Sequence, residues 1–211
     1  MSQARPLDQG LNVMSETLLQ MADLAERTVE GSISAAAQGG KLDIQVRIWS
    51  NELQGRYDDV EEKAVESIAR YQPVASDLRV IKSNMKIAYD LARLGRYAYD
   101  IVQVLDLING GKAADRVFLE KMSQKVLAMM RLSFKTLRTH DVQVARQLIE
   151  MDNEVDSLYR GYLKGLINDP NLKTAEAVST ALIARHLERI ADHAWYIAQS
   201  ISYMVTGSYI A

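Results

Sequence analysis

Hydrophobic residues recur every three or four positions along almost the whole chain. In the first stretch, from about residue 7 to residue 38, Leu11, Met14, Leu18 and Met21 follow this spacing. Such spacing matches the 3.6-residue turn of an α-helix and differs from the alternation of a half-buried strand. The pattern therefore predicts an all-α chain.

Few residues interrupt this pattern. The breaks fall at the three prolines, at two glycine pairs and at one short polar stretch: Pro6, Pro73, Pro170, Gly39-Gly40, Gly110-Gly111 and Thr139-His140-Asp141. They leave six long predicted helices, over residues 7–38, 42–71, 75–108, 112–138, 141–167 and 173–205. Helices joined by turns this short pack as antiparallel neighbours.

Particular residues mark the predicted helix ends. Asp141 is an N-cap residue, and Pro73 cannot continue the helix that precedes it. Asn109-Gly110-Gly111 supplies a left-handed stop. We also expect a turn at Asn168-Asp169-Pro170-Asn171 and a helix end at Thr206-Gly207.

The third and sixth predicted helices are similar to each other. Residues 90–101 align with residues 186–197, with Leu, Arg, Ala and Ile recurring in register. In each half an acidic stretch, residues 58–62 or 152–156, precedes a proline turn. A repeat at this period indicates tandem units. We therefore predict two three-helix units, residues 1–109 and 110–211.

Composition narrows the function classes. The chain has 211 residues, a net charge of −2 and no long basic run, so a nucleic-acid partner is not indicated. Without cysteine, a metal would need oxygen or imidazole ligands. The N-terminus lacks the apolar stretch of a signal peptide, and no run of about 18 apolar residues predicts a membrane span. We expect a cytoplasmic protein.

Two pairs of acids lie four residues apart, Asp152 with Asp156 and Glu188 with Asp192. On a helical wheel Glu188 and Asp192 fall on the side away from the main apolar stripe. Asp152 and Glu188 each lie 18 residues from Pro170, which places them at one height on antiparallel helices. We expect the four acids to form an outward-facing, exposed cluster. It is either a solvated surface or a site for hard cations, which prefer carboxylate oxygens.

Two histidines lie beside these acids. His186 and His193 are seven residues apart on one helix face. They are either auxiliary metal ligands or residues that pack against a neighbouring helix. Because no His-Glu-x-x-His spacing is present, packing is the favoured interpretation.

The last predicted helix carries the most specific motif. Residues 185–198, RHLERIADHAWYIA, and residues 203–207, YMVTG, resemble the signature of the PhoU family of phosphate-uptake regulators, as does the stretch from Asp152 to Tyr159. The resemblance implies two three-helix bundles side by side. It also implies surface metal clusters at a Glu-x-x-x-Asp motif on the third helix of each unit.

For the second unit, the resemblance assigns the metal ligands to Glu188 and Asp192, with Asp152 and Asp156 from the preceding helix. The ions it implies are divalent or iron-type. The first unit departs from the motif, because Ala92 and Arg96 stand where the family has acids. We expect no metal cluster there.

In place of a metal cluster in the first unit, we expect an ion pair between Arg96 and Asp100. The hypothesis is that Arg96 supplies a fixed positive charge where relatives bind a cation.

The resemblance implies a cytoplasmic regulator that couples a phosphate ABC transporter, through its ATPase subunit, to a sensor kinase or another regulator. Such a protein would reach the membrane only through its partners, and a homodimer is expected. No enzyme motif is found, since Gly110-Gly111-Lys112-Ala113 is not a P-loop. Two alternatives remain: an accessory module of a cation transport system, and a carboxylate-metal enzyme. The lack of any Glu-x-x-His pair disfavours the enzyme.

Overall fold

The computed structural model describes residues 5–38, 43–107, 115–168 and 174–209. These residues form six long α-helices and no strand. The helices are α1 (Pro6–Gln38), α2 (Asp43–Tyr71), α3 (Ala75–Leu107), α4 (Arg116–Thr139), α5 (Val142–Asn168) and α6 (Thr174–Thr206). The predicted all-α class and six-helix order are confirmed.

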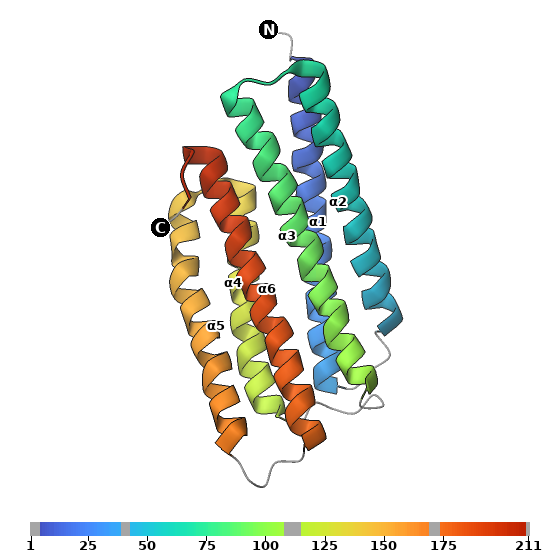
Figure 1. The fold of residues 1–211 in the computed structure, drawn as a ribbon, viewed down its shortest axis with the longest axis vertical. Coiled ribbons are helices and arrows are strands. Elements are labelled where there is room, and N and C mark those ends of the chain that lie inside the picture. The colour runs from blue at the N-terminus through green and yellow to red at the C-terminus, as the bar shows by residue number, and fades with distance from the viewer. Residues whose placement is uncertain (1–4, 39–42, 108–114, 169–173, 210–211) are drawn as a thin grey trace.

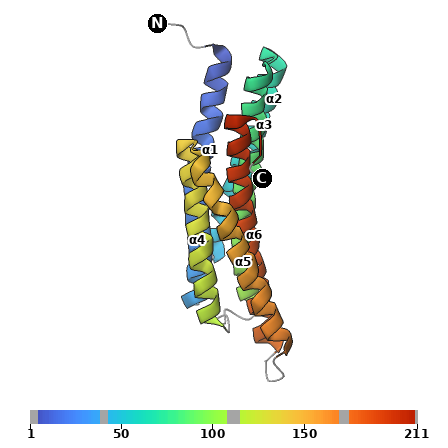
Figure 2. The same cartoon turned by 90° about the vertical axis from the view of Figure 1, so that its left-hand side faces the viewer.

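The helices form two antiparallel three-helix bundles that lie side by side. Helices α1, α2 and α3 make the first bundle, and α4, α5 and α6 make the second (Figure 1). The bundles meet most extensively where α3 packs on α6, and again where α1 packs on α4 (Figure 2). Helices α2 and α5 lie at the outer sides, so α3 and α6 occupy the centre of the molecule.

Apolar side chains at helical spacing fill both bundles and the interface between them. In α1, Met14, Leu18 and Met21 are almost completely buried. In α6, buried positions recur through the whole helix, including Leu187 and Ile190. Burying a side chain of this size contributes about 1.5–3 kcal/mol, so the periodic pattern itself drives the assembly.

The helix ends follow local chemistry. Asp115 caps α4, because its side chain accepts a 2.9 Å hydrogen bond from the Phe118 N–H. Helix α4 therefore begins at Arg116 rather than at the predicted residue 112. The predicted N-cap Asp141 accepts a 2.9 Å bond from the Gln143 N–H. Gly207 ends α6 with a φ of 80°. The predicted breaks at 39–40, 109–111 and 169–171, and the unit boundary at 109/110, lie outside the described residues.

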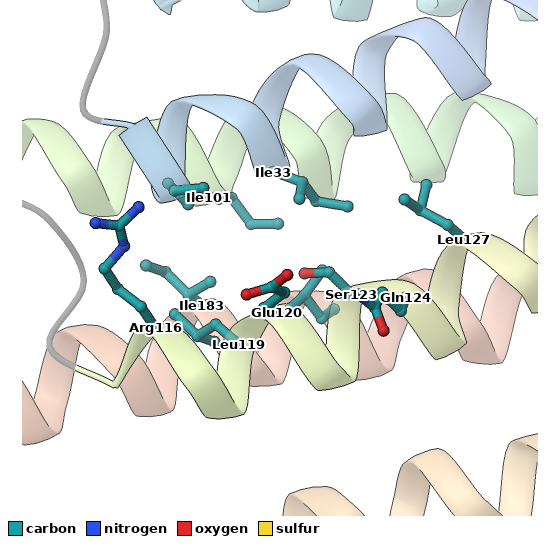
Figure 3. A pocket seen from close by; sticks show the side chains of 12 residues that line it. Ile33, Ile101, Arg116, Leu119, Glu120, Ser123, Gln124, Leu127 and Ile183 are labelled. Atoms are coloured by element: carbon teal, nitrogen blue, oxygen red, sulfur yellow. The ribbon is translucent and has the colours of Figure 1, made fainter.

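A cavity of about 340 Å³ lies between the two bundles, among α1, α3, α4 and α6 (Figure 3). Its walls are mainly apolar, and α4 contributes the polar side chains Arg116, Glu120, Ser123 and Gln124. Among the described residues that line it, Glu120 is the one acid. The predicted carboxylates therefore lie elsewhere, between α5 and α6.

Candidate metal centre

Three of the four predicted acids converge between α5 and α6. Asp156 on α5 and Glu188 and Asp192 on α6 each offer one carboxylate oxygen, and these oxygens lie within 4.8 Å of one another. Glu188 and Asp192 are one helical turn apart, so they project on one side of α6. The antiparallel packing of α5 on α6 then places Asp156 beside them. We call these three residues the carboxylate cluster.

Asp152 lies beside this cluster rather than in it. The predicted register set Asp152 against Glu188, both counted from Pro170, and this register is wrong. In the structure Asp156 joins Glu188 and Asp192, whereas the charge of Asp192 acts on Asp152. The predicted and observed registers differ by about one helical turn. The side chains packed between α5 and α6 set the register of these helices, and the position of the loop at Pro170 does not.

The carboxylate cluster is not the exposed surface that the helical wheel predicted. Glu188 is only 8% exposed, and the side chains of Asp192 and Asp156 are 17% and 28% exposed. The prediction failed because α6 packs against α3, α4 and α5. A helix covered on three sides buries residues outside its main apolar stripe.

Each carboxylate of the cluster is paired with an arginine from its own helix. The pairs are Arg160 with Asp156, Arg185 with Glu188 at 2.5 Å, and Arg189 with Asp192 at 3.0 Å. Each arginine lies three or four residues from its acid, a spacing that was visible in the sequence and was not used in the prediction. The arginines offset the mutual repulsion of the acids.

One oxygen of the cluster has no such compensation. Glu188 Oε1 binds Arg185, whereas Glu188 Oε2 is buried and has no hydrogen-bond partner among the described residues. A buried carboxylate oxygen without a partner carries a desolvation cost of about 1–3 kcal/mol or more. A bound cation or a proton removes that cost, so this oxygen marks the position where a ligand is most needed.

Glu188, Asp192 and the neighbouring Asp152 hold protons more tightly than isolated carboxyls. Burial raises the pKa of Glu188, and the nearby Asp192 charge adds to the effect. Burial also raises the pKa of Asp192, which the bond from Arg189 opposes. For Asp152, burial together with Asp192 and Asp156 raises the pKa to about 6. Burial thus disfavours the charged carboxylates of Glu188, Asp192 and Asp152, and positive charge placed beside them offsets that effect.

Neither predicted histidine joins the carboxylate cluster. The His193 side chain turns toward α3, where its Nδ1 lies 2.8 Å from Asp90 Oδ1. The His186 ring lies 6.1 Å from the Tyr97 ring, again toward α3. Both histidines thus pack against a neighbouring helix, which is the interpretation that the sequence favoured.

The first unit has no equivalent cluster among the described residues. At the corresponding positions of α3, Ala92 is buried and Arg96 is exposed. Arg96 forms the predicted ion pair with Asp100, at 3.1 Å. The two units are therefore alike in fold and different in charge.

Comparison with known proteins identifies the family. A family model of the PhoU domain matches residues 18–105 and again residues 119–201. The chain belongs to the PhoU family. Each match falls within one of the two bundles, so the chain carries the PhoU domain twice.

Relatives in the PhoU family match over most of their length. A protein of Clostridium acetobutylicum described as a phosphate-specific transport system accessory protein PhoU homolog is 29% identical over 206 residues, which cover 95% of this chain and 94% of the relative. A Pseudomonas aeruginosa protein with the same description is 30% identical over 198 residues, covering 90% of this chain and 81% of the relative.

Solved structures agree with the fold. The crystal structure of PhoU from Pseudomonas aeruginosa superposes with a TM-score of 0.86 at 29% identity, covering 95% of this chain and 99% of that one. The phosphate transport system regulatory protein PhoU from Streptococcus pneumoniae, at 22% identity, has the same fold with a TM-score of 0.87. Among the described helices of this chain, none is long and apolar enough to span a membrane.

Proposed function

We propose that this member of the PhoU family is an accessory regulator of phosphate uptake. It docks on the cytoplasmic side of a phosphate ABC transporter through the ATPase subunit and couples transport to a sensor kinase or another regulator. Two observations support this proposal. The PhoU family model matches both bundles, and relatives that match over most of their length are named as transport accessory proteins. Those names describe accessory proteins rather than enzymes, which fits a regulator that works by docking.

We further propose that the carboxylate cluster, with Asp152 beside it, holds a divalent or iron-type cation. Carboxylate oxygens suit such ions, and three donors from two helices leave room for water to complete the shell. The buried and unpartnered Glu188 Oε2 supports this fit. A bound ion supplies positive charge that joins α5 to α6. The carboxylates of Asp156, Glu188 and Asp192 position it.

In the first unit a side chain supplies positive charge at the corresponding position. Arg96 stands at the position that corresponds to Asp192, and it is paired with Asp100. A guanidinium keeps its charge at every physiological pH and does not dissociate. The first unit thus carries a permanent positive charge where the second unit carries an exchangeable one.

The regulatory proposal is tested by complementation. The chain is expressed in a bacterium whose own PhoU-family gene has been deleted, and two quantities are measured: the rate of phosphate uptake and the output of a phosphate-responsive promoter. We expect the chain to restore repression of the promoter at high phosphate. Unchanged output in cells that contain abundant folded protein, together with no binding to the transporter's ATPase subunit in a pull-down, would contradict the proposal.

A further inference from the structure

A line of basic and aromatic side chains runs along the outward face of α3. Its members are spaced four, three, four and three residues apart, and they are Lys82, Lys86, Tyr89, Arg93 and Arg96. Lys82, Lys86, Tyr89 and Arg96 are exposed, and Arg93 is partly exposed. We call this line the basic seam. Alternation of three and four is the spacing along which two helices pack lengthwise.

The charge of the basic seam is largely uncompensated. Between residues 79 and 96 the chain has five basic residues and one acid, Asp90, which is only 2% exposed and bonded to His193. Within the described part of the chain, Lys82, Lys86 and Arg93 have no carboxylate within ion-pair distance, in contrast to Arg96. Several surface cations elsewhere are paired; Arg131, for example, binds two glutamates.

Aromatic rings hold these cations in line. Lys82 Nζ lies 5.2 Å from the centroid of the Tyr203 ring, and Lys86 Nζ lies 5.4 Å from that of Tyr209. The Arg93 guanidinium lies 4.5 Å from the Tyr97 ring centroid and donates a 2.7 Å hydrogen bond to its hydroxyl. Cation–π contacts reduce the freedom of long side chains. Arginine and tyrosine are also among the residues most enriched at the energetic centres of protein interfaces.

An acidic side chain borders the basic seam on the side of α2. On α2, Glu61 accepts a 3.1 Å bond from the Tyr57 hydroxyl, and the Tyr57 ring lies 6.0 Å from the ring of Tyr89. On the other side, α6 packs against α3 (Figure 1). The cations of the basic seam form a single row along one helix. A flat anionic surface such as a lipid bilayer would bring its charges against Glu61 as well.

We propose that the basic seam is a docking site for an acidic helix of a partner protein. The partner helix lies along α3 and presents glutamate or aspartate at spacings of three and four. From Lys82 to Arg96 the seam is about 21 Å long, which matches about four turns of such a helix. The single row of cations selects a helix over a membrane, and charge complementarity sets the register and orientation of the partner.

This inference rests on the proposed function only in assuming that the protein acts by docking. A binding assay tests it separately. The probe is a fluorescent alanine-based peptide of about 18 residues, with glutamates spaced four and three apart on one face. Its comparison peptide has the same composition, with the glutamates distributed around the helix. Binding to the full chain is followed by fluorescence anisotropy at two salt concentrations.

Two triple variants carry the same change in charge. The seam variant is Lys82→Gln/Lys86→Gln/Arg93→Gln, and the control variant is Lys121→Gln/Lys135→Gln/Arg146→Gln. The control residues are exposed and form no ion pair within the described part of the chain. We expect the seam variant to bind the one-faced peptide at least about tenfold more weakly and the control variant to bind it within about twofold of the parent chain. Circular dichroism checks that both variants are folded.

Three outcomes would overturn the inference. Equal loss of binding in the two variants, or equal affinity for the two peptides, would mean that only the overall charge matters. Binding to vesicles of phosphatidylserine and phosphatidylcholine that is lost in the seam variant, without peptide binding, would identify a membrane surface instead. If the parent chain fails in complementation and still discriminates between the peptides, the regulatory proposal fails and the docking site stands.

Discussion

His193 and Asp90 meet across the interface between the two bundles, with 2.8 Å between Nδ1 and Oδ1. The internal repeat relates Asp90 to His186 and His193 to Tyr97, because the aligned segments are offset by 96 residues. The repeat-related contact is therefore Tyr97 with His186, whose ring centroids are 6.1 Å apart. One side of the interface has a buried polar pair, and the other has two neighbouring rings in its place.

The buried pair contributes to stability. Asp90 is 2% exposed and His193 is 7% exposed. We expect Asp90→Ala to lower the free energy of unfolding by about 2–4 kcal/mol, because the imidazole loses its buried partner. Urea unfolding measures the change. Asp100→Ala, which removes the partly exposed ion pair with Arg96 on the same helix, is the control and should cost less than about 1 kcal/mol. Equal costs would contradict a special role for the buried pair.

Asp152 should make stability depend on pH. Its pKa is raised from 3.8 to about 6 in the folded chain. The folded state therefore retains a proton that the unfolded state releases, and stability falls as the pH rises from about 4 to about 6. In the presence of a chelator, Asp152→Asn should raise the free energy of unfolding by about 1–2 kcal/mol at pH 7.5, allowing for partial exposure to solvent.

The same substitution should have little effect at pH 3.5, where the carboxyl is protonated in both states. Urea unfolding at the two pH values checks this. A gain of the same size at both values would mean that the carboxylate charge is not the cause.

Metal binding should depend on the carboxylate cluster. Elemental analysis of the purified chain should find a divalent or iron-type ion that is lost in Glu188→Ala/Asp192→Ala. The control is Asp58→Ala/Glu62→Ala, which removes two acids at the same spacing from α2 and should leave the metal content unchanged. Near-zero metal in the parent chain, with no rise in melting temperature on adding manganese or iron, would refute the metal site.

Gly95 permits the close approach of α2 to α3. A Cβ atom at Gly95 would lie 2.4 Å from Leu53 Cδ1, and Leu53 is fully buried. We expect Gly95→Ala to cost about 1–3 kcal/mol in the free energy of unfolding. Combined with Leu53→Ala, the added methyl group should become neutral or stabilising, because space is then available and alanine favours the helix.

Gly55→Ala is the matched control for this prediction, since a Cβ atom at this position of α2 would have no neighbouring atom of the described chain within 4 Å. It should stabilise the chain by about 0.5–1 kcal/mol. Thermal unfolding distinguishes the two glycines. Stabilisation by both substitutions would show that Leu53 moves aside at little cost.

The sequence by itself determined the helices. Apolar spacing fixed their number and order, and local chemistry fixed several of their ends, as at Asp141 and Gly207. The Arg96–Asp100 ion pair was also predictable, since both residues lie on one helix. These features depend on residues a few positions apart, whose geometry the helix itself imposes.

Only the tertiary structure decided which helix faces are covered and at what register helices meet. It buried Glu188, set Asp156 rather than Asp152 in the carboxylate cluster, and joined Asp90 to His193 from 103 residues away. These results depend on how side chains of distant segments fill the space between helices. A pattern along one helix defines a stripe, whereas the neighbours on its other sides decide whether an acid at the edge of that stripe meets water or another helix.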